Sequence, residues 1–204
     1  MIRAVVLDIG SVLEVIDDAV FPAPFERRHG LEPGAVHAAA ATLPGDAVLG
    51  GVSEAEVRAH WQRQLALSEE QTDELVADFW RWYVGELDRE LFDWFAAQRP
   101  ARRTGIVSNS GPGAREAERV WGFEAITDDI VYSHEVGLAK PDPEIFRLAA
   151  RRLGVLPSEV VFLDDVEGHV EAARGLGVHG VVHTSTPDSI REVERIIAAE
   201  EARQ

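Results

Sequence analysis

Residues 4–10 read AVVLDIG, a run of four apolar residues that ends in a carboxylate, Asp8. Several similar runs follow along the chain, and each is strand-length, rich in β-branched residues and followed by polar residues. This pattern is typical of strands covered on both faces in a parallel sheet. These similar runs are residues 104–107 before Ser-Asn-Ser, 160–163 before Asp-Asp, 178–182 before His-Thr-Ser and, more weakly, 130–132 before Ser-His-Glu.

Helical patterns lie between these apolar runs. In PEIFRLAARRL, residues 143–153, the apolar side chains recur at the spacing of one helix face, and VEGHVEAARGLG and PDSIREVERIIAAE also indicate helices. Alternating strands and helices predict an α/β fold, here a three-layer Rossmann-like core around a parallel sheet. Ligands of such sheets bind beyond the carboxyl ends of the strands, where Asp8, Ser108, Lys140 and the Asp164-Asp165 pair are expected.

Residues 15–86 interrupt this alternation because they contain no strand pattern. Two segments there begin with capping boxes, Ser53 with Glu56 and Ser68 with Gln71, and continue with apolar residues at helical spacing. We therefore predict two units: a core made of residues 1–14 and 87–204, and an all-helical cap made of residues 15–86.

The composition excludes several classes of protein. The formal net charge of −16 argues against nucleic acid or an anionic membrane as a partner. Cysteine is absent, which excludes disulfides and thiolate metal sites. The first apolar run is short and is broken by Asp8, so it indicates neither a signal peptide nor a membrane span. These features favour a cytoplasmic protein, either a monomer or a homodimer.

The order of the polar motifs carries a resemblance to a known family. Asp8 is followed by the helical insert, by Ser108-Asn109 in GIVSNSG, by Lys140 in GLAKPDP and by Asp164-Asp165 in VVFLDDVEG. This order resembles the haloacid dehalogenase superfamily of phosphohydrolases across essentially the whole chain. The insert after the first motif is similar to the small helical cap of subfamily I.

The resemblance implies a magnesium-dependent reaction. A phosphate monoester carries about two negative charges, so a carboxylate approaches it only when a cation neutralises both groups. By resemblance, Asp8 attacks phosphorus and becomes an aspartyl-phosphate. Mg²⁺ is then held by Asp8, by the backbone carbonyl of Gly10 and by Asp165, with Asp164 binding directly or through water.

The remaining motif residues are expected to bind the phosphate. The resemblance implies that Ser108 hydrogen-bonds a phosphoryl oxygen, with the Asn109 backbone nearby. Lys140 is expected to pair with Asp8 and with the phosphate, which offsets their negative charge. The substrate class implied is a small phosphorylated metabolite, and Arg27, Arg28 and His29 are the polar residues of the insert that hint at specificity.

Two residues depart from the family pattern. Gly10 stands where most phosphatases of the family have a second Asp, which protonates the leaving oxygen, and Glu14, Asp17 or Asp18 are possible substitutes. His169 stands where the resemblance usually places Asn or Asp, which predicts weaker support for Asp165 and Lys140, and we interpret it as a non-ligand.

Because of Gly10, three functions stay open. The first is a Mg²⁺-dependent phosphatase that is slow or is specialised for leaving groups needing little protonation. The second is a catalytically silent member of the family that binds a phosphorylated metabolite or a protein partner. The third is a haloacid dehalogenase, although the acidic pair Asp164-Asp165 would repel its carboxylate substrate.

Overall fold

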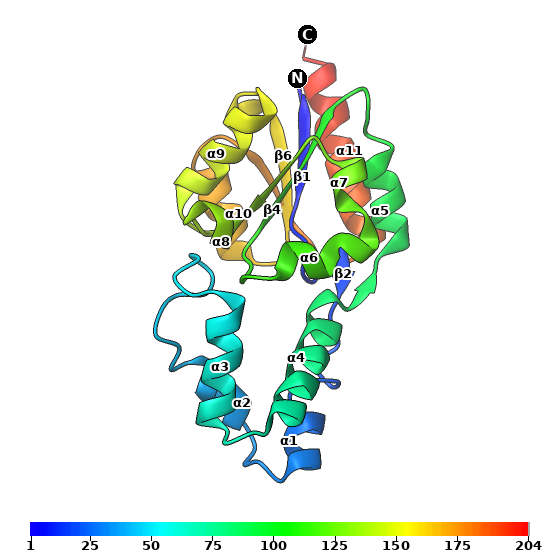
Figure 1. Ribbon diagram of the computed structural model, residues 1–204. Helices are drawn as coiled ribbons and strands as arrows, with labels where there is room; N and C mark the ends of the chain where they lie inside the picture. Colours follow the sequence, from blue (N-terminus) through cyan, green and yellow to red (C-terminus); the bar gives the residue numbers. More distant parts are fainter. Residues whose placement is uncertain (204) are drawn as a thin grey trace.

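The computed structural model describes residues 1–203 and contains a five-stranded parallel sheet (Figure 1). The strands lie in the order β5-β4-β1-β6-β7, so β1 is central. All the strands predicted from the sequence are confirmed. Their bounds are β1 Ala4–Leu7, β4 Arg103–Ser108, β5 Asp129–Tyr132, β6 Val160–Asp164 and β7 His179–Val182.

Helices cover both faces of this sheet, as its apolar strands require. Successive side chains of a strand point to opposite faces, and β1 is fully buried on both. Val5 and Leu7 belong to the cluster that includes α5 (Arg89–Ala96) and α11 (Thr186–Glu201). Ala4 and Val6 belong to the second cluster, with α9 (Pro143–Leu153) and α10 (Glu167–Arg174). The three-layer α/β fold predicted from the sequence is thus confirmed.

Short elements complete the connections around the sheet. These are α6 Ala114–Glu118, η1 Arg119–Trp121, α7 Phe123–Ile126, α8 Ser133–Val136 and η2 Pro157–Glu159. Within residues 1–203, no helix combines the length and the apolar character needed to cross a membrane.

The predicted insert contains four helices, which lie beyond the carboxyl ends of the sheet strands (Figure 1). Both predicted capping boxes are present: Ser53 caps α3, and Ser68 caps α4, each with its partner three residues later. Phe25, Trp61 and Leu75 belong to a separate apolar cluster in this region. The helices are α1 Ala23–His29, α2 Ala35–Ala40, α3 Glu54–Gln64 and α4 Glu69–Val84.

A small strand pair joins the insert to the sheet region. Strand β2, Glu14–Val15, pairs antiparallel with β3, Glu86–Leu87, and neither belongs to the central sheet. The expectation that residues 15–86 contain no strand is therefore wrong at both ends of that range, because Val15 and Glu86 are paired. We propose that this pair joins a core unit, residues 1–14 and 87–204, to a cap unit, residues 15–86.

Candidate active site

Lys140 connects the ends of two neighbouring strands. Asp8 directly follows β1 and Asp164 ends β6, and these strands pair with Leu7 opposite Leu163. The Nζ atom of Lys140 lies 2.7 Å from Oδ1 of Asp8 and 2.7 Å from Oδ2 of Asp164. Since the three side chains are almost wholly removed from solvent, one ammonium group offsets only one of the two carboxylate charges, at low dielectric.

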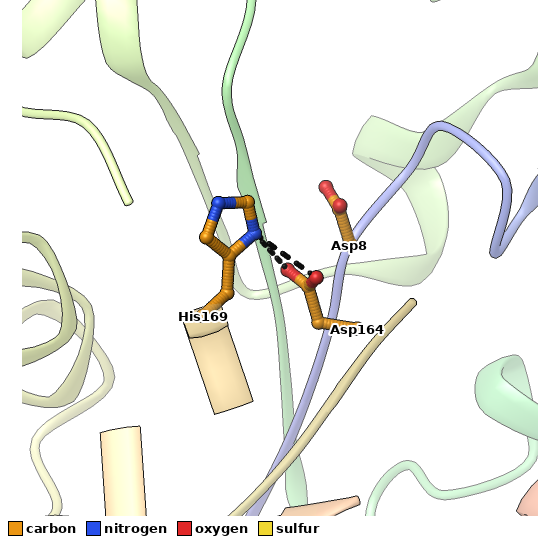
Figure 2. Close-up of side chains that lie close together, drawn as sticks. All are labelled: Asp8, Asp164 and His169. Atoms are coloured by element: carbon orange, nitrogen blue, oxygen red, sulfur yellow. Dashed lines mark hydrogen bonds and ion pairs between the residues drawn. The ribbon is translucent and has the colours of Figure 1, made fainter. Parts of the chain in front are cut away.

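Both oxygens of Asp164 are engaged by protein groups. The backbone N–H of Val166 donates to Oδ1 over 2.8 Å, and Nδ1 of His169 lies 3.0 Å from Oδ1 and 3.2 Å from Oδ2. A carboxylate only accepts hydrogen bonds, so Nδ1 carries the proton in this arrangement. Figure 2 shows the His169 ring directed at Asp164, with Asp8 beside them. His169 thus contributes support to Lys140 through Asp164, which the sequence did not lead us to expect.

The Asp8 carboxylate is anchored through one of its oxygens. Oδ1 accepts a hydrogen bond of 2.8 Å from the Ile9 backbone N–H, in addition to the Lys140 contact. Within the described part of the chain, both of these contacts fall on Oδ1, which leaves Oδ2 for a ligand. Burial raises the pKa of Asp8 to about 7, with Lys140 lowering it and Asp164 raising it. A cation at Oδ2 would favour the charged form.

Asn109 holds the backbone of Lys140 in place. Its amide Nδ2 donates to the Lys140 carbonyl, and its Oδ1 accepts from the Lys140 N–H, both over 2.8 Å. The Asn109 side chain is therefore occupied by Lys140, which is compatible with the expectation that its backbone, rather than its side chain, lies near a phosphate. Ser108 ends β4 and is buried.

A cavity of about 340 Å³ opens over these strand ends. Its walls come from the first strand and its loop, from the region joining the insert, and from the end of β4. The residues that line it are Asp8, Gly10, Ser11, Glu14, Ile16, Asp18, Trp82, Tyr83, Ser108 and Asn109. The structure thus brings Asp8, Gly10, Ser108 and Asn109 together around one cavity.

Glu14 contributes an unusual carboxyl group to the same cavity. The residue is 1% exposed, and neither carboxylate oxygen has a hydrogen-bond partner within residues 1–203. Burial, together with the neighbouring Glu118, raises the pKa of Glu14 to about 10. Asp17 and Asp18 differ from it, because Asp17 accepts from the Ala19 N–H and Asp18 accepts from Trp82 Nε1.

A second buried carboxyl group, Glu118, lies close enough to Glu14 for its charge to act on it. The Tyr132 hydroxyl donates to Oε2 of Glu118 over 2.5 Å, and burial raises the pKa of Glu118 to about 7. Burial also raises the pKa of Tyr83, with the charge of Glu118 acting in the same direction. The sequence did not indicate that Glu118, Tyr83 or Tyr132 lies near the site, because its patterns assign Tyr83 to a helix face, Tyr132 to a strand and Glu118 to no motif.

The oxygen-rich end of this cavity fits a magnesium ion. Mg²⁺ prefers hard oxygen ligands, and of the three predicted ligand residues Asp8 and Gly10 line this cavity, whereas Asp165 does not. A Cβ atom placed on Gly10 would meet nothing within 4 Å, so the space beside its backbone is open. Ligand atoms of Asp8, Asp164 and His169 lie within 4.8 Å of one another (Figure 2), whereas Asp165 lies outside this set and is exposed.

The polar residues of α1 lie away from this cavity. Arg28 forms ion pairs with Glu74 and Asp78 of α4, and His29 also contacts Glu74. Figure 1 places α1 at the end of the insert farthest from the sheet. Arg28 and His29 therefore contact α4 rather than this cavity, and Arg27 is exposed.

Comparisons with known proteins identify relatives that match part of this chain. The chain is 42% identical over 69 residues to bifunctional epoxide hydrolase 2 of Sus scrofa, a match covering 34% of this chain and 12% of that protein. It is 40% identical over 83 residues to the phosphorylated carbohydrates phosphatase of Thermotoga maritima, covering 38% of each. The chain thus spans well under two thirds of the length of these relatives.

A solved structure shares the fold over nearly the whole chain. A haloacid dehalogenase family enzyme of Bacteroides thetaiotaomicron, in complex with magnesium and inorganic phosphate, is 21% identical, with a TM-score of 0.73. The match covers 90% of this chain and 95% of that one. The family model described as haloacid dehalogenase-like hydrolase matches residues 2–177. With this match, with its parallel sheet, and with Lys140 joining Asp8 and Asp164 at adjoining strand ends, the chain belongs to the haloacid dehalogenase-like hydrolase family.

Proposed function

We propose that the protein is a Mg²⁺-dependent phosphatase acting on a small phosphate monoester through Asp8. One observation carries this proposal: Lys140 and the Ile9 N–H hold Oδ1 of Asp8, while Oδ2 stays available at a cavity. The phosphatase name of the Thermotoga relative and the magnesium and phosphate of the Bacteroides enzyme support the same reading.

The residues at the strand ends and beside the cavity are assigned different roles in binding. Asp8, the Gly10 carbonyl and Asp165 would hold Mg²⁺, which supplies the positive charge that lets a phosphate dianion approach a carboxylate. Lys140 adds a second positive charge on the opposite side of Asp8. Ser108 and the Asn109 N–H, which line the cavity, would donate to phosphoryl oxygens. Asp164 has both oxygens occupied, so we assign to it the positioning of Lys140.

The reaction then proceeds in two displacements at phosphorus. An oxygen of Asp8 forms a bond to phosphorus as the ester P–O bond breaks, and the departing oxygen takes up a proton from solvent or a nearby acid. Water next attacks the aspartyl-phosphate, its proton passes to solvent, and the P–O bond to Asp8 breaks. Inorganic phosphate leaves, and the carboxylate of Asp8 is restored.

Gly10 favours one alternative, a silent binding protein. A residue without a side chain cannot transfer a proton, and general acid–base catalysis contributes about 10² to 10⁴ in rate. The dehalogenase alternative is disfavoured by the buried Asp164 and the exposed Asp165, since a carboxylate substrate would meet additional negative charge there.

Phosphate release from p-nitrophenyl phosphate, measured with Mg²⁺ and with EDTA, tests the proposal. We expect turnover that requires Mg²⁺ and that is abolished in Asp8→Asn, because an amide cannot form the acyl-phosphate. Absence of turnover in the wild-type protein, with inorganic phosphate still bound, would indicate the silent binder. Metal-independent halide release from 2-chloropropionate would indicate the dehalogenase.

A further inference from the structure

A second cavity, larger and almost entirely apolar, adjoins the cavity of Asp8. Its volume is about 470 Å³, within the range of roughly 300–1,000 Å³ typical of small-molecule sites. Helices α2, α3 and α4 of the insert form most of its wall, and Gly111 and Pro112, just after the Ser108-Asn109 motif, close it on the sheet side. Tyr83 lines both cavities, so the two are neighbours that meet at this side chain.

An aromatic wall runs along this second cavity away from Tyr83. The Tyr83 and Trp80 rings have centroids 5.3 Å apart, Trp80 and Phe79 are 4.9 Å apart, and Phe79 and Trp61 are 5.3 Å apart. All four residues line the cavity, and the three pairs are edge-to-face. Such a wall is suited to the face or edge of a further aromatic ring.

The charged groups on this wall already have partners, whereas Trp61 Nε1 is a buried donor without one among the described residues. Oε1 of Glu54 accepts from Trp80 Nε1. The guanidinium of Arg58 pairs with Glu69 and Asp73 at 2.8 and 2.5 Å. A sugar placed here would bury hydroxyls with few partners, and each unmatched hydroxyl costs free energy. A second phosphate or carboxylate would find no uncommitted cation among the residues lining this cavity.

We propose that this apolar cavity holds the body of the substrate's leaving group, and that the substrate is an aryl phosphate monoester with an apolar ring system. The inference rests on the proposed function, because it places the phosphate at Asp8 in the adjoining cavity. Gly10 points to the same class independently. A phenolic oxygen is a good leaving group without a proton donor, so the missing side chain costs an aryl ester least.

The test compares phenyl phosphate with 2-naphthyl phosphate, whose leaving groups have similar acidity but different apolar area. We expect kcat/KM to be about tenfold higher for the naphthyl ester, as burial of roughly 50 Å² more apolar surface would give. Glucose 6-phosphate and octyl phosphate are expected to be poorer substrates than either aryl ester.

Variants of Ala55 on α3 locate the effect in the cavity. Ala55→Phe fills part of the space and Ala55→Asp places a charge there, and Asp is compatible with the first turn of a helix. Both variants should bring the naphthyl-to-phenyl ratio close to one, because the new side chain removes the apolar space for the second ring. Gln64→Phe and Gln64→Asp, at an exposed position of the same helix outside the cavity, should leave the ratio unchanged.

The possible failures of the two proposals can be told apart. Three outcomes overturn the aryl inference but leave a phosphatase. They are a naphthyl-to-phenyl ratio of one in the wild-type protein, a ratio unaffected by both Ala55 variants, and a preference for glucose 6-phosphate or octyl phosphate. If no ester is hydrolysed, calorimetry with naphthylmethylphosphonate and methylphosphonate still tests the cavity. Tighter binding of the naphthyl compound, lost in Ala55→Asp, supports an aryl subsite, and equal binding overturns it.

Discussion

Lys140 and Asp164 form an ion pair in which neither side chain is exposed to solvent, with 2.7 Å between Nζ and Oδ2. Oδ1 of Asp8 lies at the same distance from this ammonium group. A buried charge that loses its partner keeps its desolvation cost. Removing one partner of such an ion pair therefore destabilises the folded protein strongly. The three residues are therefore interdependent in stability as well as in the proposed catalysis.

Lys140→Met should lower the free energy of unfolding by about 3–5 kcal/mol, since two carboxylates would remain buried without their cation. Urea denaturation at neutral pH measures this change. Arg147→Met is the matched control, because Arg147 pairs with Glu144 on the exposed surface of α9. We expect that control to change stability by less than about 1 kcal/mol. Equal effects of the two substitutions would contradict the assigned role of Lys140.

Asp165→Asn should lower Mg²⁺ affinity at least about tenfold. Mutation of residues that only hydrogen-bond to metal ligands commonly causes a loss of this size, so mutation of a ligand should cause at least as much. Titration calorimetry with MgCl₂ measures it. Asp164→Asn is the informative comparison, because we assign Asp164 to Lys140 rather than to the metal. Its effect should fall mainly on unfolding, and an unchanged Mg²⁺ affinity in Asp165→Asn would refute the proposed ligand set.

Glu14 should make the stability of the protein depend on pH. Its folded-state pKa of about 10 lies above the ordinary value of 4.5, so the folded state holds a proton that the unfolded state releases. Stability contributed by this proton is fully present below about pH 4.5 and is lost as the pH rises toward 10. Glu14→Gln should remove this loss, which amounts to about 1.4 kcal/mol per pH unit.

The measurement is the free energy of unfolding of the wild-type protein and of Glu14→Gln at several pH values between 5 and 8. The difference between them should grow with pH in favour of the variant. Glu90→Gln, at an exposed position of α5, controls for the loss of one carboxylate. Parallel curves for the wild-type protein and Glu14→Gln would show that Glu14 ionises normally.

The sheet and the order of its motifs could be predicted because both are local in sequence. Strands β1 and β6 contain unbroken apolar runs, and Asp8 directly follows the first strand while Asp164 ends the second. The β2-β3 pair could not be predicted, since two residues show no periodicity and Glu14–Val15 pairs with residues far along the chain.

The surroundings of the site could be predicted less well, because they depend on how side chains pack. The contact of His169 with Asp164 is made within one strand-to-helix turn, yet only the structure shows that the ring faces the carboxylate. Glu118 comes from a helix without a motif, and only the packing of the chain shows that its charge acts on Glu14. The apolar cavity combines three helices of the insert with Gly111 and Pro112, so the pattern of one segment does not reveal it.

Gly10→Asp should restore the proton donor that this chain lacks. The backbone of Gly10 is not in the left-handed region, and a Cβ there would meet nothing within 4 Å, so the new side chain can be placed without a clash. Hydrolysis of an alkyl phosphate should rise by up to about 10², because a departing alkoxide depends on protonation. Hydrolysis of an aryl phosphate should rise much less, since a phenolate tolerates its own charge.

The two rates are compared in steady-state assays with Mg²⁺, using Asp8→Asn as the inactive control. An equal rise on both esters would mean that the new carboxyl group acts on something other than the leaving oxygen. No rise on either would mean that another group already donates the proton, and Glu14→Gln then decides whether that group is the buried carboxyl lining the same cavity. A selective rise on the alkyl ester would show that Gly10 itself restricts this enzyme to leaving groups that depart without help.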